Sequence, residues 1–141
     1  MRSVLVAFAM LVASTPAGAG ELWPQPEGGW RFALTVPAGP GRQRYAYIDA
    51  DPAPPGGWRV TVTCGLEDAR TGRVLFRAVG RGTSNRGPSP GFGGQWSWPG
   101  GGAASFVITQ SLRDPEALRL PAEFTAPECP RRGMGDLSTG D

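Results

Sequence analysis

The sequence contains no histidine and no lysine. Without imidazole, Ser-His-Asp and Cys-His catalysis, most zinc sites and imidazole-based pH sensing are excluded. Without lysine no Schiff base can form, and every side-chain cation is an arginine whose charge is fixed near neutral pH. These absences remove the commonest routes to enzymatic chemistry, so we expect a protein that is not an enzyme.

Paired carboxylates are the remaining catalytic option. The candidate pairs are Asp49 with Asp51, which share a strand face, and Glu67 with Asp68, which lie beside a predicted turn. A glycosidase needs two carboxyls about 5 Å or about 6.5–9.5 Å apart across a cleft, which so small a chain would struggle to build. Asp49 and Asp51 also form a very weak calcium pattern. We therefore expect no catalytic residues and no metal ligands.

No glycine-rich segment follows a strand and opens a helix, so the sequence predicts no nucleotide and no other cofactor. The charges are nearly balanced, at 14 arginines against 12 acidic residues, with no basic stripe along the chain. Nucleic acid is therefore not an expected partner.

No apolar run approaches the roughly 20 residues that a membrane-spanning helix needs. The longest run, residues 4–12, follows Arg2 and precedes a small-residue pattern at 17–19. This order is typical of an export signal. We expect residues 1–19 to be a signal peptide, the mature chain to have no membrane span, and the protein to be secreted or periplasmic.

There are only two cysteines, Cys64 and Cys129. In an exported chain an even count favours a disulfide, and with two cysteines the pairing is forced. The alternatives are two free thiols or a bridge between chains.

Alternating apolar and polar residues predict short strands. The clearest are 30–36, 44–50 and 58–66, and residues 73–79 return to make a hairpin over 58–80. A tight turn ending at Gly72 joins the two strands of that hairpin.

The second half of the chain is less regular. Residues 81–102 contain eight glycines and three prolines and are expected to be a long loop. Residues 104–111 predict a strand, and 118–125 predict an edge strand because Pro121 does not suit a central one. Residues 131–141 lack apolar periodicity and are expected to be a flexible C-terminal tail.

Short strands, frequent turns and almost no helix predict an all-β fold in one domain, residues 20–130. The expected architecture is a small antiparallel β-sandwich, immunoglobulin-like in general architecture only, and the alternative is a small β-barrel.

Three aromatic residues are the candidate ligand-binding residues: Phe92, Trp96 and Trp98. Trp96 and Trp98 fall on one face if the segment is extended, where flat rings would stack on sugars or anchor a protein contact. The competing interpretation is that they fill the core, and we expect at least one to be buried.

The sequence thus favours an exported, non-enzymatic module that contacts another macromolecule, with a protein or glycan partner that it does not identify. A carbohydrate-binding module using the aromatic loop is the alternative. Open edge strands offer a second way to bind, because they can accept a strand from a partner.

Overall fold

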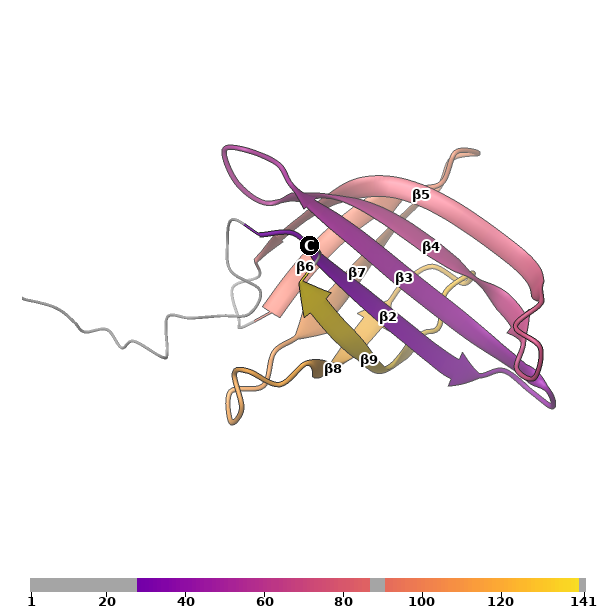
Figure 1. Ribbon diagram of the computed structural model, residues 1–141. Helices are drawn as coiled ribbons and strands as arrows, with labels where there is room; N and C mark the ends of the chain where they lie inside the picture. The colour runs from indigo at the N-terminus through magenta and orange to yellow at the C-terminus, as the bar shows by residue number, and fades with distance from the viewer. Residues whose placement is uncertain (1–27, 87–90, 140–141) are drawn as a thin grey trace, which may run out of the picture.

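The computed structural model describes residues 28–86 and 91–139, so the predicted signal peptide lies outside the described residues (Figure 1). Eight antiparallel strands follow one another around a closed barrel, in which the last strand pairs with the first. They are β2 (Trp30–Pro37), β3 (Arg42–Pro52), β4 (Trp58–Asp68), β5 (Val74–Arg86), β6 (Gly91–Ser97), β7 (Ala103–Thr109), β8 (Arg119–Phe124) and β9 (Arg132–Thr139).

The all-β prediction is confirmed, and the barrel alternative describes the architecture better than the sandwich does. Alternation places Trp30, Phe32 and Leu34 of β2 inside, each at most 1% exposed. The 58–80 hairpin is present as β4 and β5, with Trp58 opposite Ser84 and Val62 opposite Gly80. Local patterning therefore located these strands, whereas closure depends on pairing between the two ends of the chain.

The interpretation of residues 131–141 as a tail is wrong for 132–139. These residues form β9, which pairs with β2 on one side and β8 on the other. Its apolar alternation is hidden because two inward positions are Gly133 and Gly135. A Cβ on Gly135 would lie 2.3 Å from the ring of Phe32, so the neighbouring aromatic residue occupies the space of the missing side chain.

The interpretation of 81–102 as one long loop is also wrong. Residues up to Arg86 belong to β5 and residues from Gly91 to Ser97 form β6, while 87–90 lie outside the described residues. Gly82, Gly91 and Gly94 are packing positions. A Cβ on Gly94 would lie 2.4 Å from the Phe106 ring, and one on Gly82 would lie 1.8 Å from the carbonyl oxygen of Gln95.

The close approach at Gly82 gives a stability prediction. Gly82→Ala should destabilise the protein by about 3 kcal/mol, because the obstacle is backbone that cannot swing aside. The measurement is urea unfolding followed by tryptophan fluorescence. Gly100→Ala is the matched control, since a Cβ there would meet nothing within 4 Å. Similar losses in the two variants would contradict this account of the glycines.

Pro121 does not mark an outer edge, because β8 has neighbours on both sides. The β7–β8 ladder is short and ends at the pair Ile108 and Ala122. Pro121 lies one residue beyond that pair, so its missing N–H interrupts no β7–β8 pair. The predicted strand 118–125 is present as β8, but it is not an edge strand.

The two ends of the barrel differ. One end carries the connections 53–57 and 110–118, and inside it Trp30 packs on Phe92 at a ring separation of 5.0 Å. The opposite end carries the connections 38–41, 69–73, 98–102 and 125–131. We call it the disulfide end, because Cys129 lies in the last of these connections.

Candidate interaction surface

The three aromatic residues predicted to bind ligand lie on the inner side of β6 and just beyond it. Phe92 is 1% exposed and Trp96 is 2% exposed, and both belong to the core. Trp98 is partly buried against that core, with its ring 5.5 Å from the ring of Trp96. Stacking on a sugar requires an open ring face. Phe92 and Trp96 present no such face in this fold.

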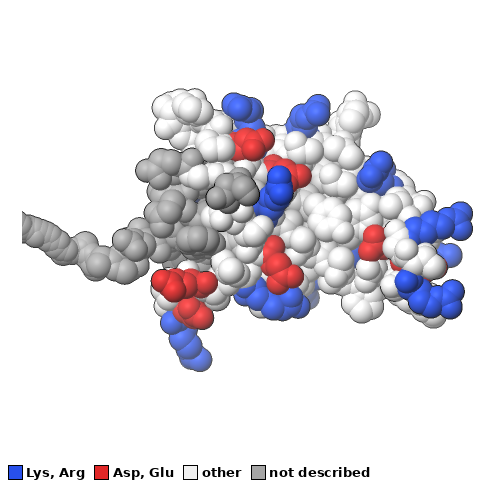
Figure 2. Space-filling view, viewed as in Figure 1, with Lys and Arg blue, Asp and Glu red and all other residues white. Residues whose placement is uncertain are grey.

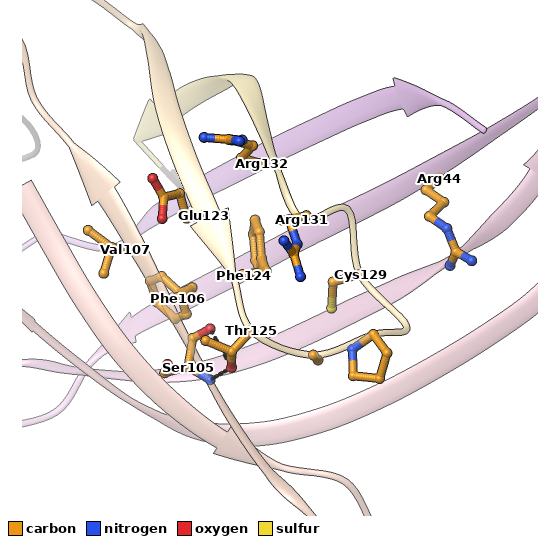
Figure 3. Close-up of a pocket in the computed structure, with 12 residues that line it drawn as sticks. Arg44, Ser105, Phe106, Val107, Glu123, Phe124, Thr125, Cys129, Arg131 and Arg132 are labelled. Carbon is orange, nitrogen blue, oxygen red and sulfur yellow. Dashed lines mark hydrogen bonds between the residues drawn. The ribbon is translucent and has the colours of Figure 1, made fainter.

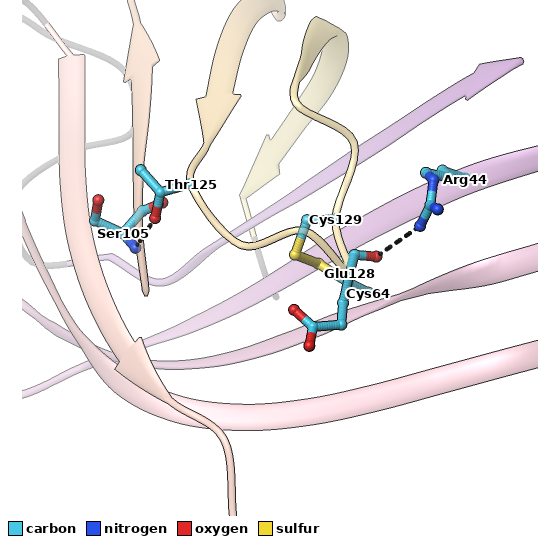
Figure 4. Close-up of a disulfide and its surroundings, with 6 residues drawn as sticks. All are labelled: Arg44, Cys64, Ser105, Thr125, Glu128 and Cys129. Atoms are coloured by element: carbon cyan, nitrogen blue, oxygen red, sulfur yellow. Dashed lines mark hydrogen bonds between the residues drawn. A yellow bond between two sulfur atoms is a disulfide. The ribbon is translucent and has the colours of Figure 1, made fainter. Parts of the chain in front are cut away.

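The predicted disulfide between Cys64 and Cys129 is confirmed, with the two Cα atoms 5.0 Å apart. Cys64 points inward from β4, and the bond ties the β8–β9 connection to that strand (Figure 4). Arg44 adds a long hydrogen bond, donating from Nη1 to the carbonyl of Glu128 at 3.5 Å. The connection is thus held against β3 and β4. The disulfide is consistent with a location outside the cytoplasm.

A cleft of about 720 Å³ lies beside this connection (Figure 3). Its charged side chains are Arg44, Arg131, Arg132 and Glu123, and most of its other lining residues are apolar. Thr125, which also lines it, accepts a hydrogen bond at Oγ1 from the Ser105 amide at 2.9 Å. In a chain without histidine no imidazole activates such a hydroxyl. The cleft brings three arginines and one glutamate together at the disulfide end.

Asp49 and Asp51 face outward from β3. Asp49 forms an ion pair with Arg31 at 2.9 Å, between two exposed side chains. Among residues 28–86 and 91–139, no group of three or more cysteine or acidic side chains could hold a metal ion. Asp49 therefore acts as a surface partner of Arg31 in this structure.

The other carboxylate pair, Glu67 and Asp68, lies at the end of β4 next to the β4–β5 turn. Asp68 Oδ1 accepts hydrogen bonds from the amides of Arg70 and Thr71, at 2.8 and 2.9 Å. The Thr71 and Arg70 amides lower the pKa of the Asp68 carboxyl below its ordinary value, because they stabilise its charged form. Glu67 accepts a hydrogen bond from the Gln43 side-chain amide. Asp68 thus stabilises the β4–β5 turn, whereas Glu67 links β4 to β3.

Three consecutive apolar residues follow this turn and are exposed. We call Val74, Leu75 and Phe76 the apolar tip; they are 48%, 42% and 44% exposed. A β-bulge places Val74 opposite Glu67 and Phe76 opposite Leu66, which leaves Leu75 without a direct partner. The sequence predicts these residues only as part of the strand 73–79. Three large apolar residues in a row do indicate an exposed apolar surface, because a strand with one buried face cannot bury all three.

The strand that carries the apolar tip is longer than its neighbour. β5 pairs with β4 from Val74 to Ser84, but with β6 only from Arg81 onward. Within the described part of the chain, no strand pairs with residues 74–80 on the side away from β4. We call this side of residues 74–80 the free edge. Figure 1 shows β5 curving on to the turn at the right of the view.

Positive charge accompanies the free edge. Arg77 and Arg81 are exposed and flank Val79, which is 40% exposed. Their partners on β4 are Gly65 and Thr61, which carry no charge. The ion pairs formed within the described residues involve Arg31 and Arg119. Figure 2 shows blue side chains gathered at the right, where the 38–41 and 69–73 turns lie.

No family model, curated protein or solved structure matches this chain. Among the residues that the structure describes, no helix is long and apolar enough to cross a membrane.

Proposed function

We propose that this chain is an exported, non-enzymatic binding module that contacts a protein partner outside the cytoplasm through the apolar tip. The observation that carries the proposal is the exposure of Val74, Leu75 and Phe76 beside a row of arginines. Exposed apolar surface rimmed by polar residues is typical of an interaction site. Two of the three side chains, Val74 and Leu75, are aliphatic, and aliphatic side chains favour a protein partner over a glycan, whose recognition depends more on aromatic stacking and hydrogen bonds.

Two further observations support the location and the non-catalytic role. The Cys64–Cys129 disulfide is consistent with an oxidising compartment, secreted or periplasmic, in line with the predicted signal peptide. The carboxylates Asp49, Glu67 and Asp68 are engaged in surface contacts rather than gathered across a cleft. A binding role needs none of the chemistry that the sequence lacks.

Photo-crosslinking in the organism that makes the protein tests this proposal. A photoreactive amino acid at Leu75 should form one dominant protein adduct. The same group at Leu112 is the matched control, since Leu112 is 81% exposed but lies at the opposite end of the barrel. It should form little or none of that adduct. Equal labelling at both positions, or no adduct at either, would contradict a specific contact at the apolar tip.

A further inference from the structure

The free edge directs backbone groups as well as side chains outward. The carbonyl oxygen of Phe76 points toward Gly65 of β4, since a Cβ on Gly65 would lie 2.2 Å from it. In an antiparallel ladder the N–H and C=O of one residue point to the same side of the strand, and those of the next residue point to the opposite side. The amide and carbonyl groups of Arg77 and Val79 therefore point away from β4, toward the side where β6 has ended. This is an open template for another strand.

We propose that an acidic, extended segment of the protein partner adds to β5 as a strand along residues 74–80. This inference rests on the proposed function and specifies how that partner binds. The segment would continue the line of β6 beyond the last β5–β6 pair, Arg81 with Ser97. Main-chain hydrogen bonds would supply affinity, and the side chains beside the edge would supply specificity.

The side chains along the edge define the chemistry of that segment. On the outer surface it would lie beside Arg77, Val79 and Arg81, all of them exposed. Acidic residues opposite Arg77 and Val79 complement that row, because the position opposite Val79 is diagonal to both arginines. The position opposite Arg81 itself is taken by Ser97. On the other surface it would lie beside Phe76 and Ala78, which favours apolar residues. The matching sequence alternates acidic and apolar positions.

Charge argues against a second copy of this chain as the occupant. Two β5 edges paired with each other would bring the arginines of one copy beside those of the other. Like charges directly opposite across a ladder are destabilising. The segment also cannot be strongly basic for the same reason. We therefore expect the free protein to be a monomer in analytical ultracentrifugation.

Amide hydrogen exchange on the free protein tests whether the edge is open. The amides of Arg77 and Val79 should exchange at least about tenfold faster than those of Phe76 and Ala78, which point toward β4. Equal protection of the two sets would mean that the edge is already covered. Concentration-dependent protection would mean that a second copy covers it. Either result would overturn the proposal.

Peptide binding tests whether the edge takes an acidic strand. Two labelled heptapeptides are compared, one in which aspartate alternates with valine and one in which lysine alternates with valine. Fluorescence anisotropy should show the aspartate peptide binding at least about tenfold more tightly. It should also slow exchange at Arg77 and Val79. Val79→Pro, which removes an edge amide, should weaken binding about tenfold, whereas Val79→Thr, which keeps it, should change binding little.

A charge reversal keeps the test decisive if the proline variant folds poorly. Arg77→Glu with Arg81→Glu should invert the preference toward the lysine peptide, and Arg59→Glu on β4 is the control that should not. Absence of binding, equal binding of both peptides or an unchanged preference would overturn strand addition. A crosslink at Leu75 with those negative results would leave the proposed function standing. No crosslink would contradict the proposed function itself.

Discussion

Replacing Trp96 by alanine should destabilise the barrel by about 3–5 kcal/mol. The side chain is 2% exposed, and its ring centroid lies 6.2 Å from those of Phe106 and Phe124. Truncation would remove a large buried surface and leave a cavity between rigid strands. Urea unfolding monitored by far-ultraviolet circular dichroism measures the loss without depending on tryptophan emission.

Two control variants separate burial from other effects of the substitution. Val107→Ala changes a 53% exposed residue on β7 and should alter the free energy of unfolding by less than about 0.5 kcal/mol. Trp96→Phe keeps a ring and removes an indole N–H that is buried without a hydrogen-bond partner among the described residues. It should therefore retain more stability than alanine does. A Trp96→Ala loss comparable to that of Val107→Ala would make Trp96 a surface residue and revive it as a binding platform.

Breaking the Cys64–Cys129 bond should cost about 2–5 kcal/mol, which Cys129→Ser measures by urea unfolding. The bond joins residues 65 positions apart, and a loop of that size gives about 4 kcal/mol by the loop-entropy argument. It also links the β8–β9 connection to the interior, where Ala126 and Cys129 are 5% and 4% exposed.

Reduction of the bond should loosen the β8–β9 connection before it unfolds the whole protein. Once the bond is reduced, the amides of residues 126–130 should exchange faster, whereas those of the 53–57 turn at the opposite end should be unaffected. Dithiothreitol should lower the unfolding midpoint of the wild type toward that of Cys129→Ser and leave the variant unchanged. A wild-type midpoint insensitive to the reductant would contradict a stabilising role for this bond.

Strand positions in the first half of the chain followed from local pattern. Trp30, Phe32 and Leu34 alternate with smaller or polar residues, and the structure keeps that alternation across β2. The hairpin of β4 and β5 and the inward position of Cys64 were recognisable for the same reason. The disulfide pairing needed only the count of two cysteines. Each of these features depends on neighbours in sequence or on composition.

Closure of the sheet depended on features that local pattern does not record. β9 and β6 carry glycines at inward positions, and a glycine contributes no hydropathy to an alternating pattern. Its role becomes visible only when Gly135 is seen against Phe32, or Gly94 against Phe106. Pairing of β2 with β9 then joins opposite ends of the chain. A barrel and a sandwich share the same local alternation, so only this long-range pairing separates them.

The candidate interaction surface also depends on tertiary structure. Trp96 and Trp98 are the conspicuous aromatic residues of the sequence, but closure of the barrel places the face of β6 that carries Trp96 in the core. The exposed alternative arises because β5 extends 13 residues while its neighbour β6 has seven. The length of one strand follows from its local sequence, but an unpaired edge depends on the lengths of two neighbouring strands. It exists only once tertiary structure has placed them side by side and one of them ends first.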